Sequence, residues 1–312
     1  MVACLTLGLV AGSVPVSIRD VWSGLWDSSS AAAPIVRELR APRVVLAFLV
    51  GGSLGVCGAA LQAMIGNPLA EPYLLGLSGG AGLGAVSAIA ARLAGPWAVP
   101  VAAFVGALVA VALVYRLSVV AGRRLDPAVL LLSGVVVGSF ATALVSAIMA
   151  VSDASGVRSA FLWLLGGFGT TSWRSVGIFA SYGIVPLGFI GWNARGLDLI
   201  ALGEEPASHL GQDVERTRKV VYLCTALLTA ASVAVCGIIG FVGLVVPHAV
   251  RLIVRPLHRV LLPVVFLVGG CFLVLSDVIA RTVVRPLELP VGVVTALVGV
   301  PLFAVLLRRT LR

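Results

Sequence analysis

The chain has 312 residues, of which 60% are hydrophobic and only 11% are charged, and its mean hydropathy is +1.11. Soluble domains carry about 25% charged residues, so this composition excludes a water-soluble fold. The formal net charge is +9, but the arginines lie in gaps between apolar runs, which is typical of membrane-protein loops and not of nucleic-acid binding. The five cysteines lie inside apolar runs without a CxxC pair, which indicates small core residues and neither a disulfide framework nor a metal site.

Apolar runs of membrane-spanning length follow one another along the chain. A bilayer core requires about 20 apolar residues per helix. The sequence predicts spans near 43–65, 73–91, 97–120, 129–151, 176–193, 219–236, 240–254, 260–280 and 290–307. The stretch 2–18 is a tenth candidate, either a partial helix or the remainder of a helix that begins upstream of Met1. We therefore expect an all-α polytopic membrane protein, with residues 1–312 forming a single transmembrane domain of about ten helices.

Glycine is frequent, with 36 residues, and many glycines are four residues apart. The pairs are Gly51 and Gly55, Gly80 and Gly84, and Gly134 and Gly138. In a membrane helix this spacing clears one face for close packing against another helix. Tight bundle packing is the favoured interpretation; a helix that moves against its neighbour is the alternative.

The loops predict a weak sidedness. With a cytoplasmic N-terminus and ten spans, the inner loops 66–72, 116–128, 194–218 and 251–259, with the tail from Arg308, hold most of the basic residues. Four arginines precede the second span on the outer side: Arg19, Arg37, Arg40 and Arg43. Their side chains either snorkel to lipid headgroups or form a docking patch for an acidic soluble partner.

The chain lacks an energy source of its own. A P-loop requires GxxxxGK[ST], and the only lysine, Lys219, stands between Arg218 and Val220. Ion-coupled transporters bury carboxylates in their spans, and Asp277 is the one convincing candidate. Arg281 lies four residues later on the same helix face and is a natural partner for Asp277. The pattern favours a protein driven by a partner, with an ion-coupled secondary transporter as the alternative class and a passive channel as a third.

The loop 194–218 is the longest polar stretch after the first span. Leu197, Ile200 and Ala201 form a short apolar stripe, and Gly203 breaks it. Pro206 suits the first turn of a second short helix, and Gly211 suits its end. The pattern equally fits two small helices that act as a rigid handle and an ordinary capped connector.

A GxSG sequence at 76–79 also matches the motif of rhomboid proteases, which use a membrane Ser–His dyad. His209 and His258 fall in predicted cytoplasmic loops, too far in depth to activate Ser78, and the predicted spans exceed those of that fold. We therefore disfavour a protease. None of the three histidines, which include His248, lies clearly in a path, and we predict no metal ligand.

Several motifs then resemble the FecCD-type permease subunits of ABC importers, which take up iron chelates and vitamin B12. The motifs, in chain order, are LRAPR (39–43), GAALQAMIGNPLAEPYLLGLSGGAG (58–82), WLLGGFGTTSW (163–173), LIALGEEPASHLG (199–211), GIIGFVGLVVPHAVR (237–251), HRVLLP (258–263) and SDVIARTVVRPLELPVGVVTALVGVPLF (276–303). One motif alone would be weak, but together they cover most of the chain at family-like spacing.

The resemblance implies a type II ABC importer permease of ten helices in the cytoplasmic (inner) membrane that forms a homodimer, with the substrate path on the two-fold axis. It implies two cytoplasmic ABC ATPase subunits, which hold ATP and Mg, and a periplasmic substrate-binding protein. The chain itself would be no enzyme, hold no cofactor and bind no nucleic acid.

The resemblance also implies roles for particular residues. Residues 197–211 would be the cytoplasmic coupling helices, and the contacts to the ATPase would be Leu202, Gly203, Glu204, Ala207 and Leu210. The cytoplasmic gate would be formed by Asn67 and Leu69 and, before the fifth span, by Pro127 and Ala128. There the family pattern has small hydroxyl residues where this chain reads LDPAV. Arg40, Arg43 and Arg281 would dock the binding protein.

The cargo is implied only as a class. WLLGGFGTTSW and HRVLLP resemble the vitamin B12 permease more than an average siderophore permease, which favours vitamin B12 slightly. Haem and ferric siderophores remain alternatives.

Overall fold

The computed structural model describes residues 1–12, 16–27, 29–122, 126–284 and 286–310. Parts of the predicted loop 116–128 and of the C-terminal tail, as well as Pro15, lie outside these ranges. The described chain is built from helices and contains no strand within those ranges. The fold is therefore the all-helical membrane fold that the hydropathy pattern predicts.

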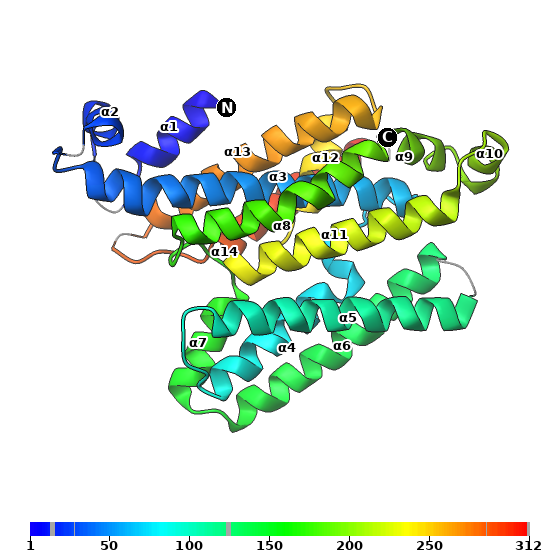
Figure 1. The fold of residues 1–312 in the computed structure, drawn as a ribbon, viewed down its shortest axis with the longest axis horizontal. Helices are drawn as coiled ribbons and strands as arrows, with labels where there is room; N and C mark the ends of the chain where they lie inside the picture. The colour runs from blue at the N-terminus through cyan, green and yellow to red at the C-terminus, as the bar shows by residue number, and fades with distance from the viewer. Residues whose placement is uncertain (13–15, 28, 123–125, 285, 311–312) are drawn as a thin grey trace.

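The long helices run side by side along the longest axis of the molecule (Figure 1). The helices in the first half are α1 (Val2–Val10), α2 (Ile18–Trp26), α3 (Ala41–Ile65), α4 (Leu77–Ala90), α5 (Ala98–Gly122), α6 (Pro127–Val151) and α7 (Ala154–Leu164). Those in the second half are α8 (Trp173–Trp192), α9 (Ala194–Ile200), α10 (Glu204–His209), α11 (Val214–Cys236), α12 (Val242–Arg251), α13 (His258–Thr282) and α14 (Val291–Thr310). A π-helical segment, Ile35–Arg40, leads into α3, and a short 3-10 turn, Pro72–Leu75, leads into α4.

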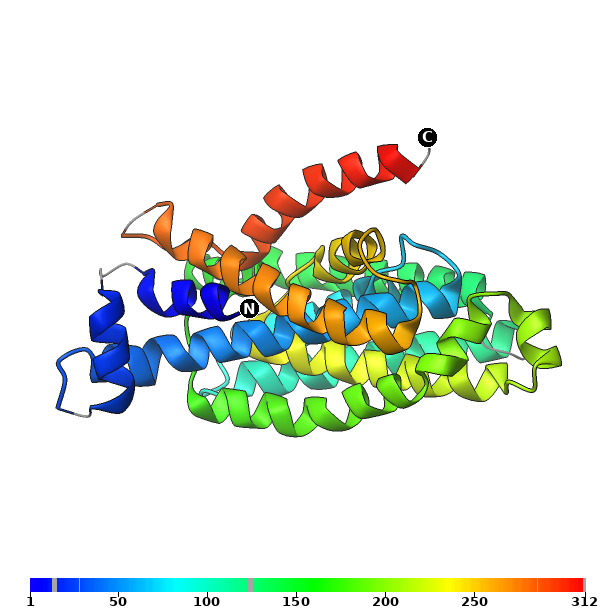
Figure 2. The same cartoon turned by 90° about the horizontal axis from the view of Figure 1, so that it is seen from above.

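The helices form two layers around α3 and α11. Helices α4, α5, α6 and α7 lie on one side, and α8, α12 and α13 on the other (Figure 1). The small helices α1 and α2 lie at one end of the bundle, and α9 and α10 lie at the opposite end. Turned by 90°, the molecule shows α14 leaning away from the body on the face opposite α8 (Figure 2).

Every predicted span coincides with a helix, although the helices differ in length. Within the described residues, six helices are long and apolar enough to cross a membrane. Helices α4, α12 and α14 are shorter apolar helices. Within its described residues, the stretch 2–18 contains the nine-residue α1 and the first residue of α2. The span expected over 240–254 contains α12, whose ten residues rise about 15 Å, half of the ~30 Å hydrocarbon.

The glycine pairs lie where helices touch. A Cβ on Gly51 would collide with the Gly269 carbonyl of α13, and one on Gly80 would collide with Ala110 and the Gly106 carbonyl of α5. Gly134 meets the Leu74 carbonyl in the same way. The close packing predicted from the spacing is thus confirmed. It also accounts for the SGGAG sequence, since Gly79 and Gly80 lie in the contacts of α4 with α6 and α5.

Candidate functional site

The two short helices α9 and α10, which we call the handle, project from one end of the bundle (Figure 1). Gly203 separates them with a φ of +116°, a conformation that glycine adopts without strain. Gly211 follows α10 with a φ of +79°. Two short helices are therefore present on either side of Gly203, one of the two arrangements that the sequence left open.

The handle has a buried base and an exposed tip. Leu197 and Ile200 of α9 are buried, and Ala207 of α10 is fully buried against Ile200 and Val214. In contrast, Leu202 is 66% exposed and Leu210 is 64% exposed. Large apolar side chains held outward on a rigid base are typical of a surface that another protein covers.

An ion pair ties the handle to α11. Glu204 Oε2 lies 2.9 Å from Arg218 Nη1. Arg218 is largely buried and borders a small cavity together with Met64, at the end of α3, and Pro127, at the start of α6. The handle is therefore one side chain away from the helix ends that carry the predicted gate.

A second link, which the sequence did not reveal, joins the handle to α13. Asp198 Oδ1 lies 2.6 Å from His258 Nδ1 and accepts a hydrogen bond of 2.8 Å from the His258 backbone N–H. The His258 side chain is only 5% exposed. One carboxylate of α9 thus binds both the first side chain and the first amide of α13. The two residues are 60 positions apart, and no local spacing connects them.

The predicted gate residues occupy two turns at the handle end. Asn67 follows the end of α3, and its Oδ1 accepts a hydrogen bond of 2.9 Å from the Leu69 N–H. The Leu69 side chain is 44% exposed. Pro127 and Ala128 open α6, whose N-cap is Asp126. Asp126 Oδ1 accepts from the Ala128 N–H at 2.8 Å, the same cap that a small hydroxyl residue supplies. Asp126 thus supplies at this position a hydrogen bond that a small hydroxyl residue could also supply.

The turn after Asn67 and Leu69 is anchored in the protein interior. Glu71 Oε1 accepts a hydrogen bond of 2.7 Å from the Phe241 N–H, and Tyr73 Oη accepts one of 3.2 Å from the Ile239 N–H. These donors belong to the non-helical segment 237–241 that interrupts the chain before α12. Burial raises the pKa of Glu71, although the bond from Phe241 opposes that rise. The Glu71 carboxylate thus joins the turn after the predicted gate residues to the non-helical segment 237–241.

The opposite end of the bundle, which we call the arginine end, contains a buried charge network. Asp277, 1% exposed, lies 2.8 Å from Arg43 Nη2 and 3.2 Å from Arg281 Nε. Arg43 also reaches Glu288 at 2.9 Å, at the surface. The Asp277–Arg281 pair predicted from the four-residue spacing is confirmed.

The same network holds α1 in place. Arg281 Nη2 donates to the Gly8 carbonyl at 2.7 Å, and Arg40 Nη1 donates to the carbonyls of Leu9 and Val10, both at 2.7 Å. These are the last carbonyls of α1, which lack partners inside the helix. The three arginines predicted to dock a binding protein are brought together, but they contact the chain itself and are 3–12% exposed. Their docking role stays a prediction.

The chain matches known proteins over nearly its whole length. The model of the FecCD transport family matches residues 1–309. The ABC transporter permease protein YvrB of Bacillus subtilis is 37% identical over 318 residues, covering 98% of this chain and 90% of that protein. The cobalamin import system permease protein BtuC of Halobacterium salinarum is 43% identical over 277 residues, covering 89% and 74%. The vitamin B12 import system permease protein BtuC of Salmonella typhi is 38% identical, covering 98% and 94%.

A solved structure agrees with the sequence comparison. A metal-chelate type ABC transporter in an inward-facing conformation superimposes with a TM-score of 0.86 and 28% identity, covering 98% of this chain and 95% of that one. PsaBC from Streptococcus pneumoniae superimposes with a TM-score of 0.59 at 14% identity, a likeness of fold alone. The chain therefore belongs to the FecCD transport family and is a multi-pass membrane permease subunit of an ABC importer.

Proposed function

We propose that this chain forms the conduit of an importer for a cobalt or iron chelate, as a homodimer that two cytoplasmic ABC ATPase subunits drive. ATP and Mg would be held by those subunits, and a periplasmic binding protein would deliver the cargo. The handle is the observation that carries the proposal. It places Leu202 and Leu210 outward on a buried base, a shape suited to a cleft on an ATPase subunit.

Movement of the handle reaches the bundle through two polar links. Gly203 supplies the break between α9 and α10, and Ala207 fixes α10 against its base. When the ATPase pair closes on ATP, the Glu204–Arg218 pair would pull on α11 and the Asp198–His258 pair on α13. Because both links are short and partly buried, they transmit displacement better than exposed flexible contacts do.

The gate would be the ring of Asn67, Leu69, Pro127 and Ala128 from the two copies. All four lie at the handle end, at the termini of α3 and α6. Arg218 supports this assignment, because it borders Pro127 and pairs with Glu204. A displacement of the handle would thereby change the spacing of the α6 N-termini.

A second copy would cover the apolar faces of α6 and α14. Phe140 on α6 is 67% exposed and Leu297 on α14 is 68% exposed. Helix α14 leans away from the body of the single chain (Figure 2), and its exposed apolar face would pack against a partner helix. A largely apolar path suits a bulky chelate, which must be released after it enters.

At the arginine end we propose that the binding protein docks. Arg43 and its surface partner Glu288 lie at the edge of the network, and Arg40 and Arg281 lie beneath. An acidic residue of the binding protein would compete with Glu288 for Arg43. Docking strength should then fall with salt concentration.

Among chelates we propose cobalamin first, because two of the similar proteins are named as cobalamin or vitamin B12 import permeases. Haem and ferric siderophores are the other candidates. The test is uptake of cyanocobalamin, haemin and ferrichrome by proteoliposomes that contain the complete complex. We expect uptake of one class, abolished when ATP is withheld and retained when an uncoupler dissipates the ion gradient. Accumulation driven by a gradient without the ATPase would overturn the proposal and favour a secondary transporter, and uptake that needs neither would indicate a channel.

A further inference from the structure

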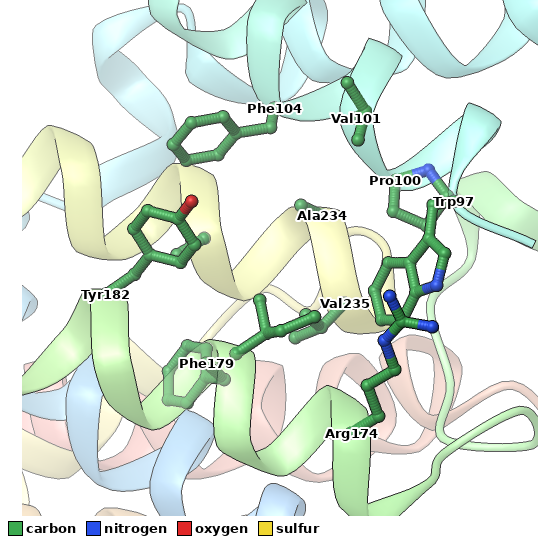
Figure 3. A pocket seen from close by; sticks show the side chains of 11 residues that line it. Trp97, Pro100, Val101, Phe104, Arg174, Phe179, Tyr182, Ala234 and Val235 are labelled. Carbon is green, nitrogen blue, oxygen red and sulfur yellow. The ribbon is translucent and has the colours of Figure 1, made fainter.

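An apolar groove of about 300 Å³ lies between α5, α8 and α11 (Figure 3). Its main lining side chains are Trp97, Phe104, Phe179, Tyr182, Ala234 and Val235. Helices α5 and α8 are both apolar spans with one face outside the bundle. We take the groove to open toward the hydrocarbon of the membrane. Helix α8, which forms one of its walls, lies on the side of the molecule opposite α14 (Figure 2).

The length of the groove matches one leaflet. Along α8 it runs from Arg174 to Tyr182, and eight residues of helix rise about 12 Å. Along α5 it runs from Trp97 to Phe104, about 10 Å. The hydrocarbon core is ~30 Å thick, so one leaflet occupies about half of that depth. The groove thus accommodates a chain from one side of the membrane and ends near the middle.

The two ends of the groove differ in chemistry. At the inner end Phe104 and Tyr182 close it, with ring centroids 6.0 Å apart. At the outer end the Arg174 guanidinium lies over the Trp97 ring, 5.2 Å from its centroid (Figure 3). This outer end belongs to the arginine end of the bundle, because Trp173 Nε1 donates to the Arg37 carbonyl at 2.8 Å.

Arg174 places a positive charge at the mouth of the groove. Its side chain is exposed, and within the described residues no carboxylate forms an ion pair with it. Arginine and tryptophan are the side chains that anchor proteins at the headgroup level, and guanidinium binds phosphate through charge-assisted hydrogen bonds. A cation at the mouth of an acyl-sized apolar groove complements a lipid whose headgroup is negatively charged.

We propose that this groove is a binding site for one anionic phospholipid of the leaflet at the arginine end. The phosphate is held by Arg174 above Trp97, and one acyl chain extends along Val235 and Ala234 toward Phe104. The cargo is a less suitable occupant, because the proposed conduit lies along α6 and α14 and not behind α8. The assignment is independent of the cargo and of the coupling mechanism.

The experiment uses the purified full-length permease, exchanged into detergent with equimolar phosphatidylglycerol and phosphatidylcholine, with retained lipids counted by native mass spectrometry. We expect the wild-type chain to retain phosphatidylglycerol with about a tenfold preference, because both lipids carry a phosphate but the choline cation of phosphatidylcholine cancels its net charge and is repelled by Arg174. Arg174→Gln should bring the preference close to one. Arg174→Lys should keep most of it, since the charge remains. Arg158→Gln, an exposed arginine on α7 outside the groove, is the matched control and should change nothing.

A second variant tests the groove and not the charge. Ala234→Phe fills the floor of the groove and should lower the total number of retained lipids, counted over both kinds, by one per chain. Ala180→Phe places the same bulk on the exposed face of α8 outside the lining and should leave retention unchanged. Equal losses in Arg174→Gln and Arg158→Gln would overturn the proposal in favour of general interface electrostatics. Unchanged retention in a folded Ala234→Phe protein, or a wild type without preference, would also overturn it.

Discussion

The two ends of the bundle place charge in opposite ways. At the arginine end, the buried Asp277 pairs with Arg43 and Arg281, and Arg281 also donates to the Gly8 carbonyl of α1. At the handle end, ion pairs link α9 and α10 to α13 and α11, while Leu202 and Leu210 face outward together with the exposed Glu205. The first arrangement holds α1, α3 and α13 together within the chain, and the second leaves apolar side chains exposed to a partner.

This difference separates residues that stabilise the fold from residues that transmit movement. A fully buried ion network is costly to break, because removing one partner leaves the others uncompensated. An exposed apolar side chain costs the fold little to change, yet it contributes strongly to binding when a partner desolvates it. Substitutions at the two ends should therefore affect different measurements.

The largest effect is expected for Asp277→Asn. The substitution leaves Arg43 and Arg281 buried without their shared anion and should cost about 3–5 kcal/mol of stability. The measurement is thermal unfolding of the detergent-solubilised protein, followed by tryptophan fluorescence. Glu288→Gln removes only the surface partner of Arg43, 40% exposed, and should cost about 1 kcal/mol or less. Equal melting temperatures for wild type and Asp277→Asn would show that water already screens the network.

At the handle end the expected effect is on assembly. Leu210→Glu should leave unfolding unchanged, because that side chain is exposed, and should weaken binding of the ATPase subunit about 30-fold, or about 2 kcal/mol. Co-purification of the two subunits measures it. Leu257→Glu changes another exposed leucine, just before α13, and is the control. If both variants retain the ATPase equally well, the handle is not its binding surface.

The contrast between the ends also marks the limit of sequence reasoning. Features with local periodicity were predictable: the apolar spans and the Asp277–Arg281 pair four residues apart. The helices about Gly203 were one of two arrangements that the pattern allowed. The Arg43–Asp277 contact joins residues 234 positions apart, and no pattern along one helix contains it. Arginines before an apolar span were therefore expected to face outward, whereas Arg40 and Arg281 are buried and donate to the carbonyls of α1.

The broken helix before α12 illustrates the same limit. Continuous hydropathy over 240–254 predicted a span, because hydropathy does not report where backbone hydrogen bonds go. The segment 237–241 instead gives two amides to Tyr73 and Glu71. Such irregular backbone is tolerated at membrane depth only when protein groups satisfy it. The motif NPLAEP thus supplies, from another part of the chain, the acceptor that makes the break possible.

A smaller effect is expected where the handle meets α13. Asp198→Ala removes both hydrogen bonds to His258 and should lower stability by about 1–2 kcal/mol. If this link transmits the movement of the handle to α13, transport should fall by more than ATPase activity does. ATP hydrolysis would continue, but α13 would no longer move with the handle. Asp198→Asn keeps an acceptor for the His258 backbone amide and should therefore recover part of the stability and part of the transport activity. Transport and hydrolysis that fall in parallel would mean that the pair only stabilises the fold.

The smallest effect is expected at Glu71, and it depends on pH. Burial raises the pKa of this carboxyl in the folded protein, so folding favours the protonated form. When the pH rises above the pKa that Glu71 has in the unfolded chain, the unfolded state ionises more readily than the folded state. The free energy of unfolding of the wild type therefore falls from its value at low pH. Glu71→Gln stays neutral and keeps an acceptor for the Phe241 amide, so its melting temperature should exceed that of the wild type at pH 8 and match it at acidic pH. A wild type that is more stable than Glu71→Gln at pH 8 would show that the ionised carboxylate is the better cap. In that case the attraction of the ionised Glu71 to the positive N-terminus of α12 must exceed the free-energy cost of burying its charge. The turn that contains Glu71 would then be held by this charge and not by a neutral hydrogen bond.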